Sequence, residues 1–197
     1  MQIPVTPLPD GNAMPRFGIG TWRMGEQTTA AAAEVTLIRA AIERGVSLID
    51  TAEMYGEGGA ESVIGQAMRD AGVPREQLHL VSKVYPHNAS KRGTIAACER
   101  SLKRLGTEFL DCYLLHWPGE HPLEDTVAAF ELLKAQGKIR AWGVSNFNVS
   151  QMEALLRIPD GHRCAVNQVG YNLMNRSIEK DLLPWCAEHK IPVMAYS

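Results

Sequence analysis

The order of apolar and amphipathic segments predicts an α/β protein, specifically a (β/α)8 TIM barrel with parallel strands. Short apolar runs of strand length alternate with longer stretches of helical periodicity throughout the 197 residues. Most of these runs end on, or just before, a polar residue able to do chemistry. A barrel carries its active site on the rim formed by the carboxyl ends of its strands. We therefore expect an enzyme.

The alternation can be followed from one element to the next. The predicted strands are Phe17–Gly20, Val46–Asp50, His79–Val84, Phe109–His116, Ile139–Val144, Ala165–Val169 and Pro192–Ser197. The predicted helices are Ala31–Arg44, Ala60–Ala71, Gly93–Leu105, Leu123–Gln136, Ser150–Ile158 and Ile178–His189. Glycines mark or follow several helix ends, as Gly45 does for the first helix. Asp10-Gly11, lying between short extended pieces, predicts a β-hairpin over Val5–Arg16 ahead of the barrel.

The number of predicted strands is one fewer than a closed barrel contains. A closed barrel has eight strands and typically about 250 residues, whereas this sequence ends at Ser197, inside or at the end of the seventh strand. We therefore expect a single barrel domain over residues 1–197, truncated after strand seven, with strand eight and the last helices missing from the chain. An open sheet of this kind would expose the edges of its first and seventh strands.

Composition limits the partners and the compartment. The sequence is 45% hydrophobic and 21% charged with a net charge of -2, and its charges are interspersed, so we expect neither a nucleic-acid nor a membrane partner. The first nine residues lack a cationic start and an apolar run, and no stretch reaches the length of a membrane span. These features predict a cytoplasmic protein. The four cysteines are widely spaced, which favours buried reduced thiols and no metal site.

The glycine-rich stretches do not predict a phosphate-binding loop. Gly18-Ile19-Gly20 has Arg23 where G-x-G-x-x-G requires its third glycine, and no helix opens directly behind it. Gly56-Glu57-Gly58-Gly59 is better explained as a flexible loop that leads into the next helix. A dinucleotide that binds here must therefore do so without the usual glycine signature.

Asp50, Tyr55, Lys83 and His116 are the strongest candidates for chemistry. Taken singly, each residue also has an ordinary structural explanation. Taken together, the four residues indicate a functional site, because adjacent parallel strands would bring all of them to one rim. We expect Lys83 to pair with Asp50 and to lower the pKa of Tyr55, whose ordinary value is about 10. With His116 orienting the substrate oxygen, this arrangement suits reduction of an aldehyde or ketone by a hydride donor.

Several longer motifs then resemble one family, the aldo-keto reductases, from the hairpin to the last residue. They are Gly18-Ile19-Gly20-Thr21-Trp22, Leu48-Ile49-Asp50-Thr51-Ala52-Glu53-Met54-Tyr55-Gly56, Val81-Ser82-Lys83, Tyr113-Leu114-Leu115-His116-Trp117-Pro118, Gly137-Lys138-Ile139-Arg140, Gly143-Val144-Ser145-Asn146-Phe147 and Ala195-Tyr196-Ser197. The resemblance implies an NADPH-dependent (β/α)8 barrel in which Asp50, Tyr55, Lys83 and His116 are catalytic. Hydride would pass from the nicotinamide to the carbonyl carbon, with the proton supplied by Tyr55. Within the family the chain is most similar to bacterial reductases of the methylglyoxal-reducing kind, which implies small reactive carbonyls such as 2-oxoaldehydes as substrates.

The same resemblance implies binding roles and a monomer when the protein is full length. It assigns the NADPH cofactor to Thr21, Asp50, Ser145, Asn146, Gln168, Tyr196 and Ser197. It assigns the substrate pocket to Trp22, Tyr55, His116 and Trp117. For the two tryptophans, simple packing in the barrel explains the residue type equally well. The family's basic motif for the adenosine 2′-phosphate is absent from the sequence.

Three classes of function stay open at this point. The first is a carbonyl reductase that acts on a small-molecule substrate. The second is a catalytically silent barrel of the same family, used as a nucleotide-binding or regulatory module. The third is a barrel isomerase that acts on sugar phosphates. Oxidation of NADPH by a panel of aldehydes separates the first from the second, and isomerisation without added nicotinamide would favour the third.

Overall fold

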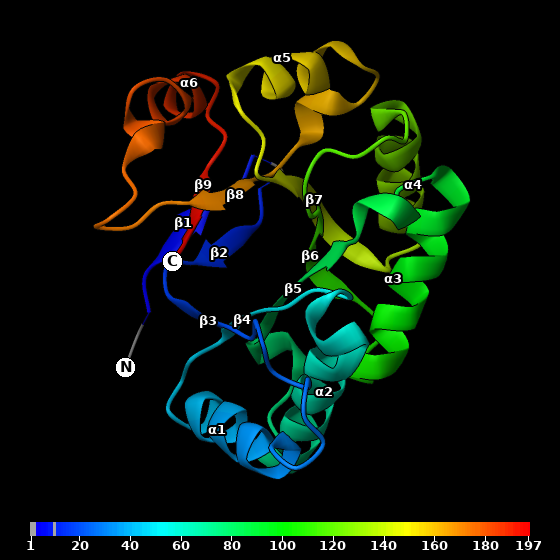
Figure 1. The fold of residues 1–197 in the computed structure, drawn as a ribbon, viewed down its shortest axis with the longest axis vertical. Helices are drawn as coiled ribbons and strands as arrows, with labels where there is room; N and C mark the ends of the chain where they lie inside the picture. The colour runs from blue at the N-terminus through cyan, green and yellow to red at the C-terminus, as the bar shows by residue number, and fades with distance from the viewer. Residues whose placement is uncertain (1–2, 10) are drawn as a thin grey trace.

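A computed structural model describes residues 3–9 and 11–197, which form a curved parallel sheet with helices around its outside (Figure 1). The sheet has seven strands, in the order β3-β4-β5-β6-β7-β8-β9, and each neighbouring pair is parallel. Spatial order therefore follows chain order, as the crossovers of a (β/α) barrel require. The predicted fold class is confirmed. Within the described residues, β3 and β9 are the edges of this sheet.

The observed elements lie close to the predicted ones. The strands of the large sheet are β3 (Gly18–Gly20), β4 (Leu48–Asp50), β5 (His79–Val84), β6 (Leu110–Leu115), β7 (Ile139–Ser145), β8 (Asn167–Gly170) and β9 (Val193–Tyr196). The α-helices are α1 (Ala31–Glu43), α2 (Gly59–Ala71), α3 (Lys91–Leu105), α4 (Leu123–Ala135), α5 (Val149–Arg157) and α6 (Leu182–Glu188). Short 3-10 turns are η1 (Tyr55–Gly58), η2 (Arg75–Gln77), η3 (Pro86–Asn88), η4 (Gly161–Arg163) and η5 (Ser177–Glu179).

The last predicted helix differs from the structure. Instead of one helix from Ile178 to His189, the chain forms η5 and then α6, which starts at Leu182. Asp181 caps α6 by accepting the Leu182 N–H at 2.6 Å. Pro184 explains the break, because a proline lacks an N–H and fits the first turn of a helix rather than its interior.

The strands separate two apolar clusters. Side chains alternate across a strand, so Tyr113 and Leu115 of β6 belong to the cluster shared with the helices, and Cys112 and Leu114 belong to the cluster inside the curved sheet. The predicted hairpin is present as β1 (Val5–Pro7) paired antiparallel with β2 (Ala13–Pro15). Leu8 and Met14 from this hairpin join the inner cluster. Asp10, one of the two predicted turn residues, lies outside the described residues.

The hairpin lies near the amino ends of the strands, where β2 shares a cleft with Ser47, His79 and Asp111. The carboxyl ends of the strands are therefore the rim on which the candidate site residues lie. All four cysteines are buried thiols outside any disulfide, as predicted. No helix in the described ranges combines the length and the apolar content needed to cross a membrane.

Candidate active site

Three consecutive strands bring the four predicted residues to the rim. Asp50 is the last residue of β4, Lys83 lies near the end of β5, and His116 follows β6 directly. Tyr55 opens η1, the turn after β4. The parallel register pairs Asp50 with Val81 and Lys83 with Leu114, so the strand ends meet at one level.

Lys83 is the centre of this cluster. Its side chain is completely buried, and its Nζ donates to Asp50 Oδ2 at 2.7 Å, to Asp50 Oδ1 at 2.9 Å and to the Thr51 carbonyl at 2.8 Å. The distance from Nζ to the Tyr55 hydroxyl oxygen is 3.4 Å. The predicted pairing of Lys83 with Asp50 is therefore present, and the lysine is more tightly bound to the carboxylate than to the phenol.

The predicted direction of the Tyr55 pKa is wrong in this structure. Burial raises the pKa of Tyr55 above its ordinary value, the Lys83 charge opposes that rise, and the Asp50 charge adds to it. The main physical reason is the burial of the phenol, and Asp50, which lies 2.7 Å from Lys83 Nζ, adds to the rise in the pKa. At neutral pH Tyr55 therefore keeps its proton and is a hydrogen-bond donor.

His116 is a neutral imidazole beside the phenol. Burial, and then the charge of Lys83, lower the pKa of His116 to about 3. The rings of Tyr55 and His116 meet edge to face, with their centroids 5.6 Å apart. Within the described part of the chain, His116 Nδ1 is buried without a hydrogen-bond partner. A neutral imidazole has one N–H to donate, so two neutral donor groups lie side by side next to the Asp50–Lys83 pair.

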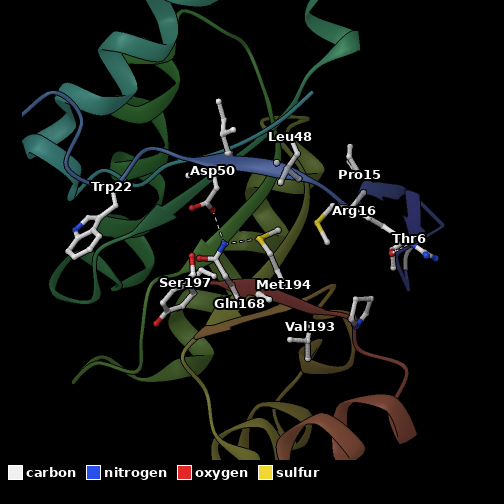
Figure 2. A pocket seen from close by; sticks show the side chains of 17 residues that line it. Thr6, Pro15, Arg16, Trp22, Leu48, Asp50, Gln168, Val193, Met194 and Ser197 are labelled. Atoms are coloured by element: carbon white, nitrogen blue, oxygen red, sulfur yellow. Dashed lines mark hydrogen bonds between the residues drawn. The ribbon is translucent and has the colours of Figure 1, made fainter. Parts of the chain in front are cut away.

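A second set of predicted residues continues the cluster across the barrel. Gln168 of β8 donates its Nε2 to Asp50 Oδ1 at 2.8 Å, and the same nitrogen lies 2.7 Å from Met194 Sδ (Figure 2). The bond joins β4 to β8 through the inside of the curved sheet. Asp50 therefore accepts hydrogen bonds from both sides of the rim.

The loop after β7 holds a further polar group. Asn146 follows Ser145, the last residue of β7, and has a positive φ of 60°. Its Nδ2 donates to the His116 carbonyl and to Ser145 Oγ, both at 3.1 Å. Tyr196 of β9 donates its hydroxyl to Asn146 Oδ1 at 2.7 Å. Four residues predicted for the cofactor, counting Gln168, thus lie on adjacent strand ends β7, β8 and β9.

A cavity of about 700 Å³ opens beside this network, between the strands β3 and β9 (Figure 2). Its lining includes Asp50 and Gln168 together with Trp22, Tyr196 and Ser197. Thr21 is placed differently, because it is completely buried and donates its Oγ1 to the Asp50 carbonyl at 3.0 Å. This hydrogen bond fixes the backbone at the end of β4.

The two predicted substrate tryptophans do not share one cavity. Trp22 lines the cavity between β3 and β9, and the residue is 63% exposed. Trp117 lines another cavity of about 680 Å³ with Tyr85 and His87. Trp117 also packs against the imidazole of His116, because the centroids of the two rings lie 4.6 Å apart. Trp117 is therefore in contact with the four-residue cluster, and Trp22 shares the cavity between β3 and β9 with Asp50 of that cluster.

Sequence reasoning missed Glu53. Its carboxylate accepts hydrogen bonds from the Tyr85 N–H at 2.8 Å, from Asn88 Nδ2 at 3.0 Å and from Arg100 Nη2 at 3.2 Å. Glu53 thereby ties the loop after β4 to the loop after β5, which carries the aromatic side chain of Tyr85. The only signal in the sequence was an acidic residue between Ala52 and Met54, which is too common to single out.

The fold and the site together define a (β/α)-barrel protein with an Asp–Lys–Tyr–His cluster on the carboxyl-terminal rim. Residues 16–197 match the Aldo/keto reductase family, and the chain belongs to that family. The predicted resemblance is confirmed.

Curated relatives and solved structures agree with this assignment. Methylglyoxal reductase YeaE of Escherichia coli (strain K12) is 55% identical over 185 residues, which are 94% of this chain and 64% of that protein. Glyoxal reductase of Bacillus subtilis (strain 168) is 38% identical over 192 residues, 96% of this chain and 65% of that protein. The chain therefore spans a little under two thirds of the length of these relatives.

Among solved structures, an aldo/keto reductase from Klebsiella pneumoniae in complex with NADP and acetate superposes with a TM-score of 0.90 at 54% identity, covering 96% of this chain and 66% of that one. An aldo-keto reductase from Klebsiella pneumoniae in complex with NADPH gives a TM-score of 0.92 at 52% identity, covering 100% of this chain and 68% of that one.

Proposed function

We propose that the full-length protein carrying this sequence reduces aldehydes or ketones to alcohols with NADPH as hydride donor. The observation that carries the proposal is the buried Lys83, bonded to Asp50 and 3.4 Å from the hydroxyl of Tyr55, on the same rim as a neutral His116. Family membership and the names of the similar reductases support it.

The four residues have distinct proposed roles. The hydroxyl of Tyr55 donates its proton to the carbonyl oxygen as that oxygen gains negative charge, and His116 donates a hydrogen bond to the same atom. Lys83 stabilises the phenolate that Tyr55 becomes, and Asp50 holds Lys83 in place. The raised pKa of Tyr55 keeps the proton in place until the substrate oxygen can accept it. Solvent then returns a proton to Tyr55.

The residues around the cavity between β3 and β9 fit a nicotinamide cofactor. When bound, NADPH supplies the hydride that the carbonyl carbon accepts. We propose that Ser145, Asn146 and Gln168 hold its carboxamide and that Tyr196 packs on the nicotinamide ring. Thr21, Asp50 and Ser197 complete the proposed cofactor set. The cavity, of about 700 Å³ with Gln168, Tyr196 and Ser197 in its lining, is consistent with this placement. The two similar solved structures, which are complexes with NADP and with NADPH, support the choice of cofactor.

The proposed substrate is a small reactive carbonyl such as a 2-oxoaldehyde, because a relative 55% identical to the chain is named a methylglyoxal reductase. Trp117 and Trp22 are proposed to border the substrate together with Tyr55 and His116. We also propose that residues 1–197 belong to one domain and that the full-length protein is a cytoplasmic monomer.

The substitution Tyr55→Phe tests the proposal. The full-length protein should oxidise NADPH in the presence of methylglyoxal, and Tyr55→Phe should lower kcat by at least about a hundredfold, because general acid catalysis contributes on that order. NADPH affinity, followed by quenching of tryptophan fluorescence, should change less than about twofold, since the hydroxyl matters only as proton donor. Full turnover by Tyr55→Phe would remove Tyr55 from its role. NADPH binding without any turnover by the parent protein would instead support the silent regulatory module.

A further inference from the structure

Behind the rim, on the helix side of the sheet, lies an ion pair between Glu61 of α2 and Arg104 of α3. Glu61 is completely buried, and its Oε2 accepts a hydrogen bond from Arg104 Nε at 2.6 Å and lies 2.6 Å from Arg104 Nη2 in the ion pair. Its other oxygen, Oε1, accepts from Ser82 Oγ at 2.6 Å. Every oxygen of this buried carboxylate therefore has a short partner, and the partners come from two different elements.

Arg104 supports the turn that carries Tyr55. This turn contains three consecutive residues with positive φ: Gly56 at 55°, Glu57 at 53° and Gly58 at 91°. Left-handed backbone is unfavourable for a residue with a side chain such as Glu57, so the turn persists only if its surroundings fix it. The guanidinium of Arg104 packs directly on Gly58, where an added Cβ would lie 2.5 Å from Arg104 Nε.

Ser82 connects the same carboxylate to the strand that carries Lys83. The two residues are consecutive in β5, so their side chains point to opposite faces of the sheet. Ser82 faces the helices and meets Glu61, while Lys83 faces the inside and meets Asp50. Glu61 thus joins the turn of Tyr55 to the strand of Lys83. It bonds to Arg104, which packs on that turn, and to Ser82, which lies in that strand.

We propose that Glu61 and Arg104 are positioning residues that set the distance between the Tyr55 hydroxyl and Lys83 Nζ. This inference rests on the proposed reductase function. Neither side chain lines the cavity between β3 and β9, so neither is proposed to touch substrate or cofactor. The contact they control is sensitive, because at 3.4 Å the Tyr55–Lys83 hydrogen bond is near the limit of useful geometry. A small displacement of the turn would remove it, whereas the Lys83–Asp50 bonds at 2.7 and 2.9 Å would remain.

The test compares two buried ion pairs. Glu61→Gln and Arg104→Met break the pair behind the rim. Asp111→Asn is the matched control, since Asp111 is also buried and bonded to Arg75 at 2.7 Å, but lies at the amino ends of the strands. Each variant of the full-length protein is measured for its thermal midpoint, for kcat and KM with methylglyoxal, and for its NADPH affinity. The pH titration of Tyr55 is followed by NMR on ¹³C-tyrosine protein, with Tyr55→Phe used to assign the signal.

We expect Glu61→Gln and Arg104→Met to lower kcat by about tenfold, the scale of a sub-ångström misplacement of a reacting group. KM and NADPH affinity should stay within about twofold, and the Tyr55 titration should move to higher pH as Lys83 loses contact. Arg104→Lys, which retains the charge but packs less closely on Gly58, should recover part of kcat. Asp111→Asn should lower the thermal midpoint without changing kcat or the Tyr55 titration.

Two results would overturn the inference. One is a Glu61→Gln protein that is destabilised like Asp111→Asn but has parental kcat and an unchanged Tyr55 titration. The other is an equal loss of kcat in Asp111→Asn. If Glu61→Gln does not fold, Ser82→Ala removes only the hydrogen bond to β5 and is expected to show the same direction of both changes. Failure of the reductase proposal is distinguishable, because the Tyr55 titration needs neither turnover nor cofactor.

Discussion

Removing Lys83 and removing Asp50 should destabilise the protein by different amounts. The Lys83→Met substitution leaves Asp50 with 16% of its side chain exposed and with the Gln168 Nε2 donor at 2.8 Å. Water and that amide still compensate the carboxylate, so we expect a loss near the lower end for a broken buried pair, about 3 kcal/mol of unfolding free energy. Asp50→Asn leaves the Lys83 ammonium with no exposure at all. Its loss should lie near the upper end, about 5 kcal/mol.

Urea unfolding of the two single variants and of the Asp50→Asn/Lys83→Met double variant measures this difference. The double variant should cost no more than Asp50→Asn alone, which corresponds to a coupling energy of about 3 kcal/mol. Matched m-values across the series would show that the denatured state is unchanged. Additive losses, or a Lys83→Met loss larger than that of Asp50→Asn, would refute the reasoning from burial.

Two further predictions concern stability. His116 has a pKa of about 3 in the folded protein and about 6.5 when unfolded, so its contribution to stability is present above about pH 6.5 and is lost as the pH falls toward 3, where the unfolded state binds the proton first. The free energy of unfolding measured against pH should fall less steeply in His116→Asn, and identical slopes in the two proteins would contradict the prediction. Gly58→Ala should cost about 2–4 kcal/mol, because its Cβ would meet Arg104 in a left-handed backbone. Gly72→Ala is the control, since Gly72 also has a positive φ but no atom within 4 Å of an added Cβ, so about 1 kcal/mol is expected. Equal losses in thermal unfolding would show that the Arg104 contact is unimportant.

The strands and the rim residues were predictable because their signals are local. A run such as Leu48-Ile49 followed by Asp50 marks a buried strand and its end, and parallel order then places successive ends together. The helix predicted from Ile178 to His189 starts too early, because Pro184 fits the first turn of a helix and not its interior, and the observed helix starts at Leu182. The direction of the Tyr55 pKa was missed for another reason. A lysine nearby was expected to dominate, but the balance depends on burial and on the 2.7 Å contact between Lys83 and Asp50.

The supporting residues were beyond sequence reasoning. Arg104 and Glu61 are 43 positions apart, and Arg100 and Glu53 are 47 apart. Each looks like an ordinary charge on a helix or in a loop, where solvation is the usual explanation. Only the packing of α2 and α3 against the sheet shows that Glu61 is buried. Contacts of this kind depend on the folded geometry, so local sequence patterns do not predict them.

The hydrogen bond from Gln168 to Asp50 joins residues 118 positions apart and crosses the hollow of the curved sheet. It links β8 directly to β4 on the opposite side of the sheet, in addition to the backbone hydrogen bonds between neighbouring strands. The Asp50 carboxylate therefore receives hydrogen bonds from Lys83 on the neighbouring strand and from Gln168 across the hollow of the sheet. A change at Gln168 therefore removes a contact between β8 and β4 and one of the hydrogen bonds to the Asp50 carboxylate at the same time.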